Sequence, residues 1–157
     1  MLGYVFWHWP SGSLAADAYE TALARFHREL AAVGSDGFLR SAAFRAEPLP
    51  WLAPGRGYED WYLVTGSYAL DPLNDIAVSP ALAPAHDVPA HAAAGGAGGL
   101  YRLQSGEEPL GSVATWLSKP KGMRYPEFYE RAAAFSEGSG RSFWRRQLVL
   151  GPATEFL

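Results

Sequence analysis

The sequence contains no cysteine in its 157 residues, and this absence excludes several kinds of chemistry. Disulfide bonds, thiolate nucleophiles, iron–sulfur clusters and cysteine-based zinc sites all need that side chain. Long apolar runs are also missing, since none approaches the roughly 18 residues of a membrane-spanning helix. We therefore expect a soluble, cytoplasmic protein with no membrane partner.

Basic residues are few and scattered. Thirteen lysines and arginines stand against 16 acidic residues, which gives a formal net charge of −3. Among the arginines only Arg145 and Arg146 are adjacent. A nucleic-acid interface needs a basic face, so we expect no nucleic-acid partner. Charged residues make up 18% and hydrophobic residues 48%, which is typical of a folded domain with a substantial core.

Motifs for metals and nucleotides are lacking as well. His86, Asp87 and His91 form the one metal-like cluster, but their spacing, interrupted by Pro89, does not place two imidazoles on one helical face. We interpret this segment as a solvated loop and expect no metal. The glycine run at 95–99 precedes a predicted strand and lacks the pattern of a nucleotide-binding loop, so no cofactor is expected.

The chain does contain an internal repeat. An aromatic strand that ends in a Pro-x-Gly turn and leads into a helix with Tyr-Glu occurs twice, 110 residues apart. Repeated supersecondary units indicate architecture. We divide the chain into a first unit, 1–105, and a partial second unit, 106–157, within one compact domain. The matched residues include Phe6 with Trp116, Tyr19 with Tyr129 and Glu20 with Glu130.

Hydrophobic periodicity places the regular elements. Ser11 or Ser13 is the expected cap of the first helix, and the prolines within 79–99 exclude one long helix there. In the strand at 38–46 we expect Phe38, Arg40, Ala42 and Phe44 to share one face. The first unit is predicted to hold strands at 4–9, 38–46, 58–67 and 100–104 and helices that end near 33 and 78. The second unit is predicted to hold a strand at 112–118, a helix at 126–135 and a strand at 143–150, after a boundary turn at 105–111.

The order β-α-β-β-α-β in the first unit is that of a ferredoxin-like α+β fold. Its crossovers cover one face of an antiparallel sheet with helices and leave the other, aromatic-rich face bare. A second sheet is the usual cover for such a face. We therefore expect a ferredoxin-like unit fused to a partial βαβ unit, with two copies forming a dimeric α+β barrel. The expected partner is a second copy of the chain.

The chain resembles the dimeric α+β-barrel superfamily, which includes NIPSNAP-like and antibiotic-biosynthesis-monooxygenase-like proteins. The resemblance rests on the order of elements, the aromatic strand Tyr58–Val64 and the helix Leu73–Val78, and it covers mainly residues 1–105. The superfamily includes cofactor-independent monooxygenases, haem-degrading enzymes, chlorite dismutases, polyketide cyclases and proteins with no known activity. The resemblance therefore implies an architecture and not a reaction.

His8 is the candidate catalytic residue. It falls in the first strand, on the face of Tyr4 and Phe6, and the repeat places Trp116 on the matching face of a later strand. Such a face would form an aromatic box around one titratable imidazole, with His8 as general base or proton shuttle. The alternative is that His8 is a structural strand histidine.

Four further residues complete the predicted ligand site. Arg40 and Arg145 alternate with apolar residues in strands next to this face and would attract an anion, unless they reach solvent or interface carboxylates. Tyr62 belongs to the aromatic third strand, and Asn74 would orient a ligand carbonyl at the mouth. We interpret Tyr19 as a packing residue of the first helix.

Three functions remain open at this level. The first is binding of a small aromatic or anionic molecule without catalysis. The second is a cofactor-independent monooxygenase or cyclase that acts on an aromatic or polyketide-like substrate. The third is haem binding, for which His8 would be the axial ligand. A pocket of several hundred Å³ around His8 and an arginine would favour the second.

Overall fold

The computed structural model describes residues 1–46, 48–52, 55–106, 113–136, 138–149 and 156. Within these residues, the strands form one antiparallel sheet in the order β2-β3-β1-β4-β5. The order of its first four strands is that of a ferredoxin-like unit, so the predicted α+β class is confirmed. The strands are β1 (Leu2–Pro10), β2 (Phe38–Ala46), β3 (Gly57–Val64), β4 (Ala93–Gly106) and β5 (Ser142–Val149).

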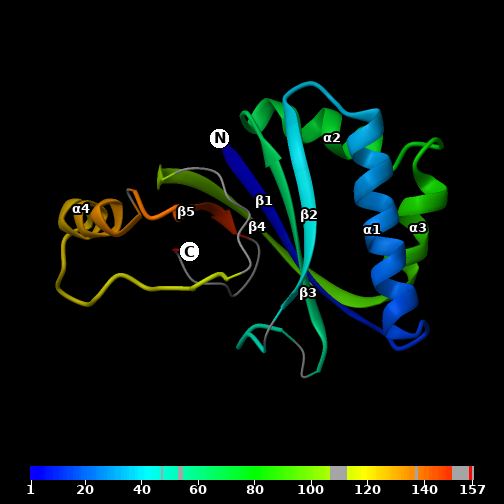
Figure 1. Ribbon diagram of the computed structural model, residues 1–157, viewed down its shortest axis with the longest axis horizontal. Helices are drawn as coiled ribbons and strands as arrows, with labels where there is room; N and C mark the ends of the chain where they lie inside the picture. Colours follow the sequence, from blue (N-terminus) through cyan, green and yellow to red (C-terminus); the bar gives the residue numbers. More distant parts are fainter. Residues whose placement is uncertain (47, 53–54, 107–112, 137, 150–155, 157) are drawn as a thin grey trace.

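The helices lie on both sides of this sheet. Three of them, α1 (Ala16–Val33), α2 (Leu70–Ala77) and α3 (Ala83–Ala92), lie on one side, whereas α4 (Tyr125–Ser136) lies beyond β5 on the other (Figure 1). A single 3₁₀ turn, Ser67–Ala69, leads into α2. In the part of the chain that the structure describes, no helix has the length and apolar character needed to cross a bilayer.

Helix α1 follows its predicted apolar stripe, but its predicted cap is wrong. Tyr19, Leu23 and Leu30 are buried against the sheet. The cap position is Ala15, which has no side chain that can bond to the helix. The Ser11 hydroxyl instead donates to the carbonyl of Ala92 at 3.0 Å. This bond ties the end of β1 to the point where α3 passes into β4.

The glycine run lies inside a strand, which corrects the prediction that it precedes one. Strand β4 begins at Ala93 and pairs with β1 through these glycines, on which aromatic rings of β1 closely pack. A Cβ added at Gly98 would stand 2.8 Å from the Tyr4 hydroxyl, and one at Gly95 would stand 2.6 Å from the Trp9 ring. Glycine in a strand allows this close approach. Helix α3 likewise replaces the predicted loop, with Pro89 inside it.

A bulge in β2 separates Phe38 from the face that it was predicted to share with Arg40, Ala42 and Phe44, which do lie on one face. The pairing with β3 shifts between Phe38 and Arg40, so that Phe38 lies opposite Val64 while Arg40 lies opposite Leu63. An extra residue in one strand reverses the alternation beyond it. Phe38 therefore packs under the helices, and Phe44 packs on the opposite face.

The face predicted to be bare is covered by the chain itself. Val5, Trp7 and Leu63 on this face are each 0% exposed. Trp51 from the β2–β3 connection and Trp116 from the segment after β4 pack over them. A partner sheet is therefore not needed to bury this face. The formation of a homodimer remains a prediction, but the need to cover a bare sheet face no longer supports it.

Of the elements predicted for the second unit, the helix and the last strand are present. Both α4 and β5 form, and β5 pairs with β4 in the same sheet. Of the predicted strand at 112–118, residue 112 lies outside the described residues, and 113–118 contain only an isolated bridge from Leu117 to Phe156. Most of the predicted boundary turn, 107–111, also lies outside them. Trp116 packs its ring against Trp7 at 5.2 Å between centroids.

Candidate functional site

A cavity of about 420 Å³ lies between the helix-covered face of the sheet and helices α1, α2 and α3. Strand β1 contributes Tyr4, Phe6 and His8 to its wall, because alternate residues of a strand point to one face. Leu73 of α2 and Phe26 of α1 form part of the apolar wall opposite. The cavity is large enough for a small organic molecule.

Strand β3 places two polar side chains beside these residues. In the antiparallel register, Phe6 lies opposite Asp60 and Tyr4 lies opposite Tyr62. Directly opposed residues of two antiparallel strands point to the same face. Asp60 and Tyr62 therefore enter the cavity wall next to His8, although Asp60 itself is only 3% exposed.

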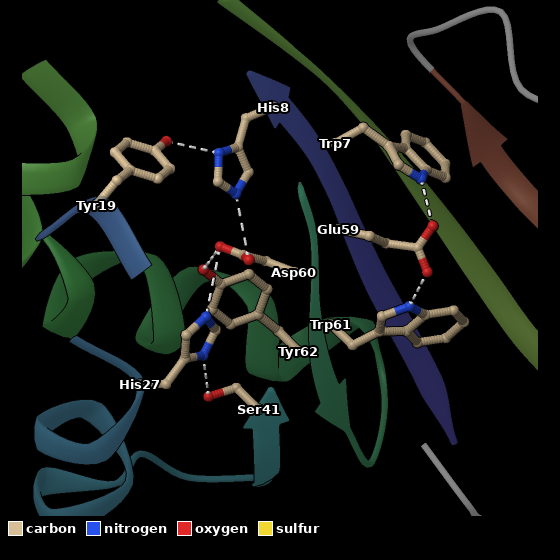
Figure 2. Close-up of polar contacts among 9 residues, drawn as sticks. All are labelled: Trp7, His8, Tyr19, His27, Ser41, Glu59, Asp60, Trp61 and Tyr62. Atoms are coloured by element: carbon tan, nitrogen blue, oxygen red, sulfur yellow. Dashed lines mark hydrogen bonds and ion pairs between the residues drawn. The ribbon is translucent and has the colours of Figure 1, made fainter. Parts of the chain in front are cut away.

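His8 stands between a phenol and a carboxylate (Figure 2). Its Nδ1 atom is 2.7 Å from the Tyr19 hydroxyl, and its Nε2 atom is 3.2 Å from Oδ1 of Asp60. The imidazole is stacked between the rings of Phe6 and Tyr58, at 5.5 and 5.6 Å between centroids. The packing and the polar contacts together hold this ring in one orientation.

Asp60 faces a second histidine from its other oxygen (Figure 2). The Nε2 atom of His27 is 3.4 Å from Oδ2 of Asp60, and its Nδ1 atom is 2.8 Å from the Ser41 hydroxyl. The Tyr62 hydroxyl donates to the same carboxylate oxygen at 3.3 Å. One buried carboxylate therefore lies between two imidazoles and a phenol.

These contacts decide the charge of Asp60. Burial alone would raise the pKa of its carboxyl group, but the facing His27 and His8 outweigh that effect and hold the pKa below its usual value. Asp60 is therefore a carboxylate at neutral pH, and the Nε2 atoms of both histidines face it at 3.2 and 3.4 Å without an aligned hydrogen bond. The Nδ1 atom of a neutral His8 is then an acceptor, and the Tyr19 hydroxyl donates to it.

The phenols of this site keep their protons. Burial, together with the nearby Asp60 carboxylate, raises the pKa of Tyr19 and of Tyr62 above that of a free tyrosine. Both are therefore hydrogen-bond donors at neutral pH. The two histidines approach different oxygens of Asp60, and among the described residues no group of three or more acidic or histidine side chains is arranged to hold a metal ion.

The structure brings five of the predicted site residues into one cavity and leaves three outside it. The five are Tyr4, Phe6, His8, Tyr62 and Asn74. Arg40, Trp116 and Arg145 are not part of its wall.

Each of the three is elsewhere for a physical reason. The bulge in β2 turns Arg40 to the opposite face. Trp116 packs in the aromatic cluster on that face. The guanidinium of Arg145, on β5, lies over the rings of Tyr125 and Tyr129 at 5.9 and 5.8 Å from their centroids.

Three residues of the network were not predicted to belong to the site. Asp60 fell within the predicted strand at 58–67 but was not assigned to the site, Tyr19 was interpreted as packing, and His27 was given no role. A signal for Asp60 was present, since an acid flanked by aromatic residues in a buried strand needs a partner. Nothing in the sequence pairs it with two histidines from different elements.

Comparisons with known proteins bear on the fold alone. No protein-family model matches the sequence, and no curated protein matches it either. Among solved structures, the chain is similar to the crystal structure of At3g17210 from Arabidopsis thaliana, with a TM-score of 0.53 and 8% sequence identity. The match covers 69% of this chain and 100% of that one. A likeness at this identity supports the α+β architecture and carries no activity.

Proposed function

We propose that this protein binds a small aromatic molecule in the cavity between the sheet and helices α1 to α3. The observation that carries the proposal is the wall itself, where Tyr4, Phe6 and Tyr62 present rings beside a fixed set of polar groups. Small-molecule sites combine apolar walls with a few oriented polar groups in this way. Tyr4, Phe6 and Tyr62 are only partly buried, so their rings remain open to a ligand.

The cavity does not suit the anionic ligand that the arginines suggested. Neither Arg40 nor Arg145 lines it, and none of the lysines and arginines that the structure describes is part of its wall. The charged carboxylates there are Asp60 and Asp71. A buried anion without a cationic partner is strongly disfavoured. The proposed ligand is therefore aromatic and carries no negative charge.

A cavity-filling variant tests this proposal. Ala77 lines the cavity from α2, so Ala77→Phe should occupy the space of a ligand ring. Ala31→Phe, on an exposed position of α1, is the matched control. Ligand-observed NMR with a panel of neutral aromatic compounds should show binding to the parent protein and to the control. Affinity should fall at least about tenfold in Ala77→Phe, and equal binding by both variants would place the ligand elsewhere.

The second candidate function is an acid–base enzyme of the cyclase or cofactor-independent oxygenase kind. The arrangement Asp60–His8–Tyr19 favours it, because a carboxylate that orients a histidine, which in turn accepts from a hydroxyl, is the logic of a catalytic triad. A substrate with an acidic C–H or O–H group would give its proton to the Tyr19 oxygen as the tyrosine proton moves to Nδ1 of His8. Asp60 would stabilise the imidazolium that forms.

Proton exchange separates this candidate from binding alone. An aryl 1,3-diketone carries acidic C–H groups, and NMR in deuterated water follows their exchange. Tyr19→Phe should slow any catalysed exchange by about a hundredfold or more and leave binding intact. Tyr58→Phe is the matched control, because Tyr58 stacks on His8 but its hydroxyl donates to Glu20 at 3.0 Å. Equal exchange rates in both variants would exclude a role for Tyr19.

The haem alternative with His8 as the axial ligand does not fit the geometry of this residue. An axial histidine needs a free ring nitrogen that points at the iron. The two ring nitrogens of His8 face Tyr19 and Asp60 at 2.7 and 3.2 Å, and its side chain is only 3% exposed. His8 could bind iron only after losing one of these contacts.

A further inference from the structure

We infer that the cavity selects a positively charged ligand, an arylalkylammonium or a quaternary ammonium compound, over neutral and anionic analogues of the same shape. This inference rests on the proposed function, since it names the class of molecule that the cavity would take. It follows from the charges around the cavity, from the aromatic faces in its wall and from the partners of its histidines.

The elements that enclose the cavity carry almost no positive charge. No lysine or arginine occurs before Arg25 or between Arg56 and Arg102, so β1, β3, α2, α3 and the cavity-lining part of β4 have none. The cations of α1, Arg25 and Arg28, lie on its exposed side, and Arg25 pairs with Glu29 at 2.6 Å. The field in the cavity is therefore set by carboxylates.

Two of these carboxylates line the cavity itself. Asp60 lies at its inner wall, buried and facing His8 and His27. Asp71 lies at the start of α2, where its side chain is exposed to solvent. A charged ligand group near Asp60 would interact through a medium of low effective dielectric constant, whereas the exposed Asp71 would act through solvent and more weakly. Such an arrangement attracts an ammonium group and repels a carboxylate.

The histidines around the cavity cannot reverse this sign. His8 and His27 both face Asp60, and Nδ1 of His86 lies 2.9 Å from Oδ1 of Asp87. If all three imidazoles were protonated, the carboxylates of Asp60, Asp71 and Asp87 would still balance them. At neutral pH, where these carboxylates are ionised, the site is therefore neutral or negative and not net positive.

Aromatic faces give a second reason to expect a cation. Tyr4 and Tyr62 lie with their centroids 5.9 Å apart on neighbouring strands, and Phe6 and Phe26 also line the cavity. The face of an aromatic ring carries negative potential, and desolvated ammonium groups gain from contact with it. Several aromatic rings together with a carboxylate are features by which proteins recognise organic ammonium groups.

A series of three probes tests the inference. The probes share a 2-naphthylmethyl group and end in an ammonium, a hydroxyl or a carboxylate, and calorimetric titration at neutral pH gives each affinity. We expect the ammonium probe to bind about tenfold tighter than the hydroxyl probe. The carboxylate probe should bind more weakly than both.

Charge reversal at the rim provides the matched variants. Asp71→Lys should reduce the preference for ammonium over carboxylate severalfold, and Asp75→Lys, the same change at an exposed position of α2 outside the lining, should reduce it much less. Asp60→Asn should also reduce the preference for ammonium over carboxylate. Because Asp71 is exposed, Asp71→Lys provides a test that does not depend on the folding of the buried Asp60→Asn variant.

The outcomes separate this inference from the proposed function. Equal affinities for the three probes, or tightest binding of the carboxylate, would overturn the charge selection and leave small-molecule binding standing. An equal effect of Asp71→Lys and Asp75→Lys would overturn the role of the cavity wall in it. Failure of all three probes to bind would count against the proposed function, and the inference would fall with it.

Discussion

Glu59 and Asp60 are neighbours in β3, and they show how the two faces of one sheet differ. Glu59 points to the face that the chain covers with tryptophans, where it accepts from the indole N–H of Trp7 at 2.7 Å and of Trp61 at 2.6 Å. Asp60 points to the helix-covered face and the cavity, where it meets His8 and His27. Both carboxyl groups are buried.

The pKa values of the two carboxyl groups shift in opposite directions. Burial raises the pKa of Glu59, and the bonds from Trp61 and Trp7 offset only part of that shift. Burial acts on Asp60 in the same direction, but the two histidines reverse it, and the pKa of Asp60 is lowered. Indoles donate a hydrogen bond but cannot become cations, whereas imidazoles can do both. The packed face therefore buries its acid for structure, and the cavity face keeps a charge available for a ligand.

Removal of each carboxylate should give the largest contrast between the faces. Asp60→Asn takes away the charge that two histidines and Tyr62 share, and breaking a buried ionic contact in this way costs about 3 kcal/mol. Glu59→Gln keeps one acceptor for two indoles and should cost about 1 kcal/mol, the price of one unsatisfied buried donor. Urea unfolding at pH 7 measures both. Equal costs would show that the histidines give Asp60 no special role.

The elements of the fold were largely predictable, because local periodicity governs them. The alternation Tyr4, Phe6, His8 predicted β1 and the shared face, and the stripe Tyr19 to Leu30 predicted α1. Local pattern also identified His8 as the polar residue in an aromatic strand. The period of a segment and the face on which a residue lies can be predicted from neighbouring residues in the sequence alone.

The parts that could not be predicted depend on contacts between distant segments. The bulge that places Arg40 on the face opposite to Phe38 arises from pairing with β3. No residue of β2 predicts this bulge from the sequence. The glycines of β4 join the strand because rings of β1 cover them. Trp116 repeats Phe6 in sequence but packs in a tertiary cluster. A repeat in sequence preserves the local pattern of residues but not the tertiary contacts that each residue makes.

Added volume on β4 should distinguish the dense face from the cavity face. A Cβ at Gly99 would lie 2.9 Å from the ring of Tyr101, which is 0% exposed and has no room to move. Gly99→Ala should therefore cost about 2 kcal/mol from overpacking. A Cβ at Gly98 would meet the hydroxyl end of Tyr4, which can swing toward the cavity.

Gly98→Ala should therefore change the free energy of unfolding by less than about 0.5 kcal/mol, since lower entropy of the unfolded chain offsets a mild contact. Thermal or urea unfolding of the two alanine variants measures the difference. If Gly98→Ala costs as much as Gly99→Ala, the cavity face is as tightly packed as the other and the proposed ligand space is not accessible.

A smaller effect is expected at the outer end of the histidine network. Ser41→Ala removes the hydroxyl that bonds to Nδ1 of His27, a contact of 2.8 Å at a partly buried position. The loss should be about 1 kcal/mol. Ser105→Ala is a matched control of similar burial, because the Ser105 hydroxyl bonds to Ser136 at 2.7 Å, far from the cavity. NMR of the His27 ring should change in Ser41→Ala and stay the same in Ser105→Ala, and the reverse result would contradict the network.

The smallest expected difference between the two faces is the direction in which pH changes the loss of stability caused by Asp60→Asn and by Glu59→Gln. A lowered pKa means that the ionised Asp60 stabilises the fold above the ordinary carboxyl value of 3.8, and this stabilisation is lost as the pH falls through the lowered pKa. The loss of stability that Asp60→Asn causes should therefore become smaller as the pH falls below 3.8 toward the lowered pKa.

Glu59 should show the opposite trend in a different pH window. Its raised pKa means that the contribution of the protonated acid is complete below the ordinary value of 4.5 and is lost as the pH rises through the raised pKa. The deficit of Glu59→Gln should shrink as the pH rises above 4.5. Urea unfolding of both variants and the parent across the acid and neutral range gives the two slopes. Slopes of the same sign would mean that the two faces treat a buried acid alike, whereas we expect opposite signs because histidines face Asp60 and neutral indoles donate to Glu59.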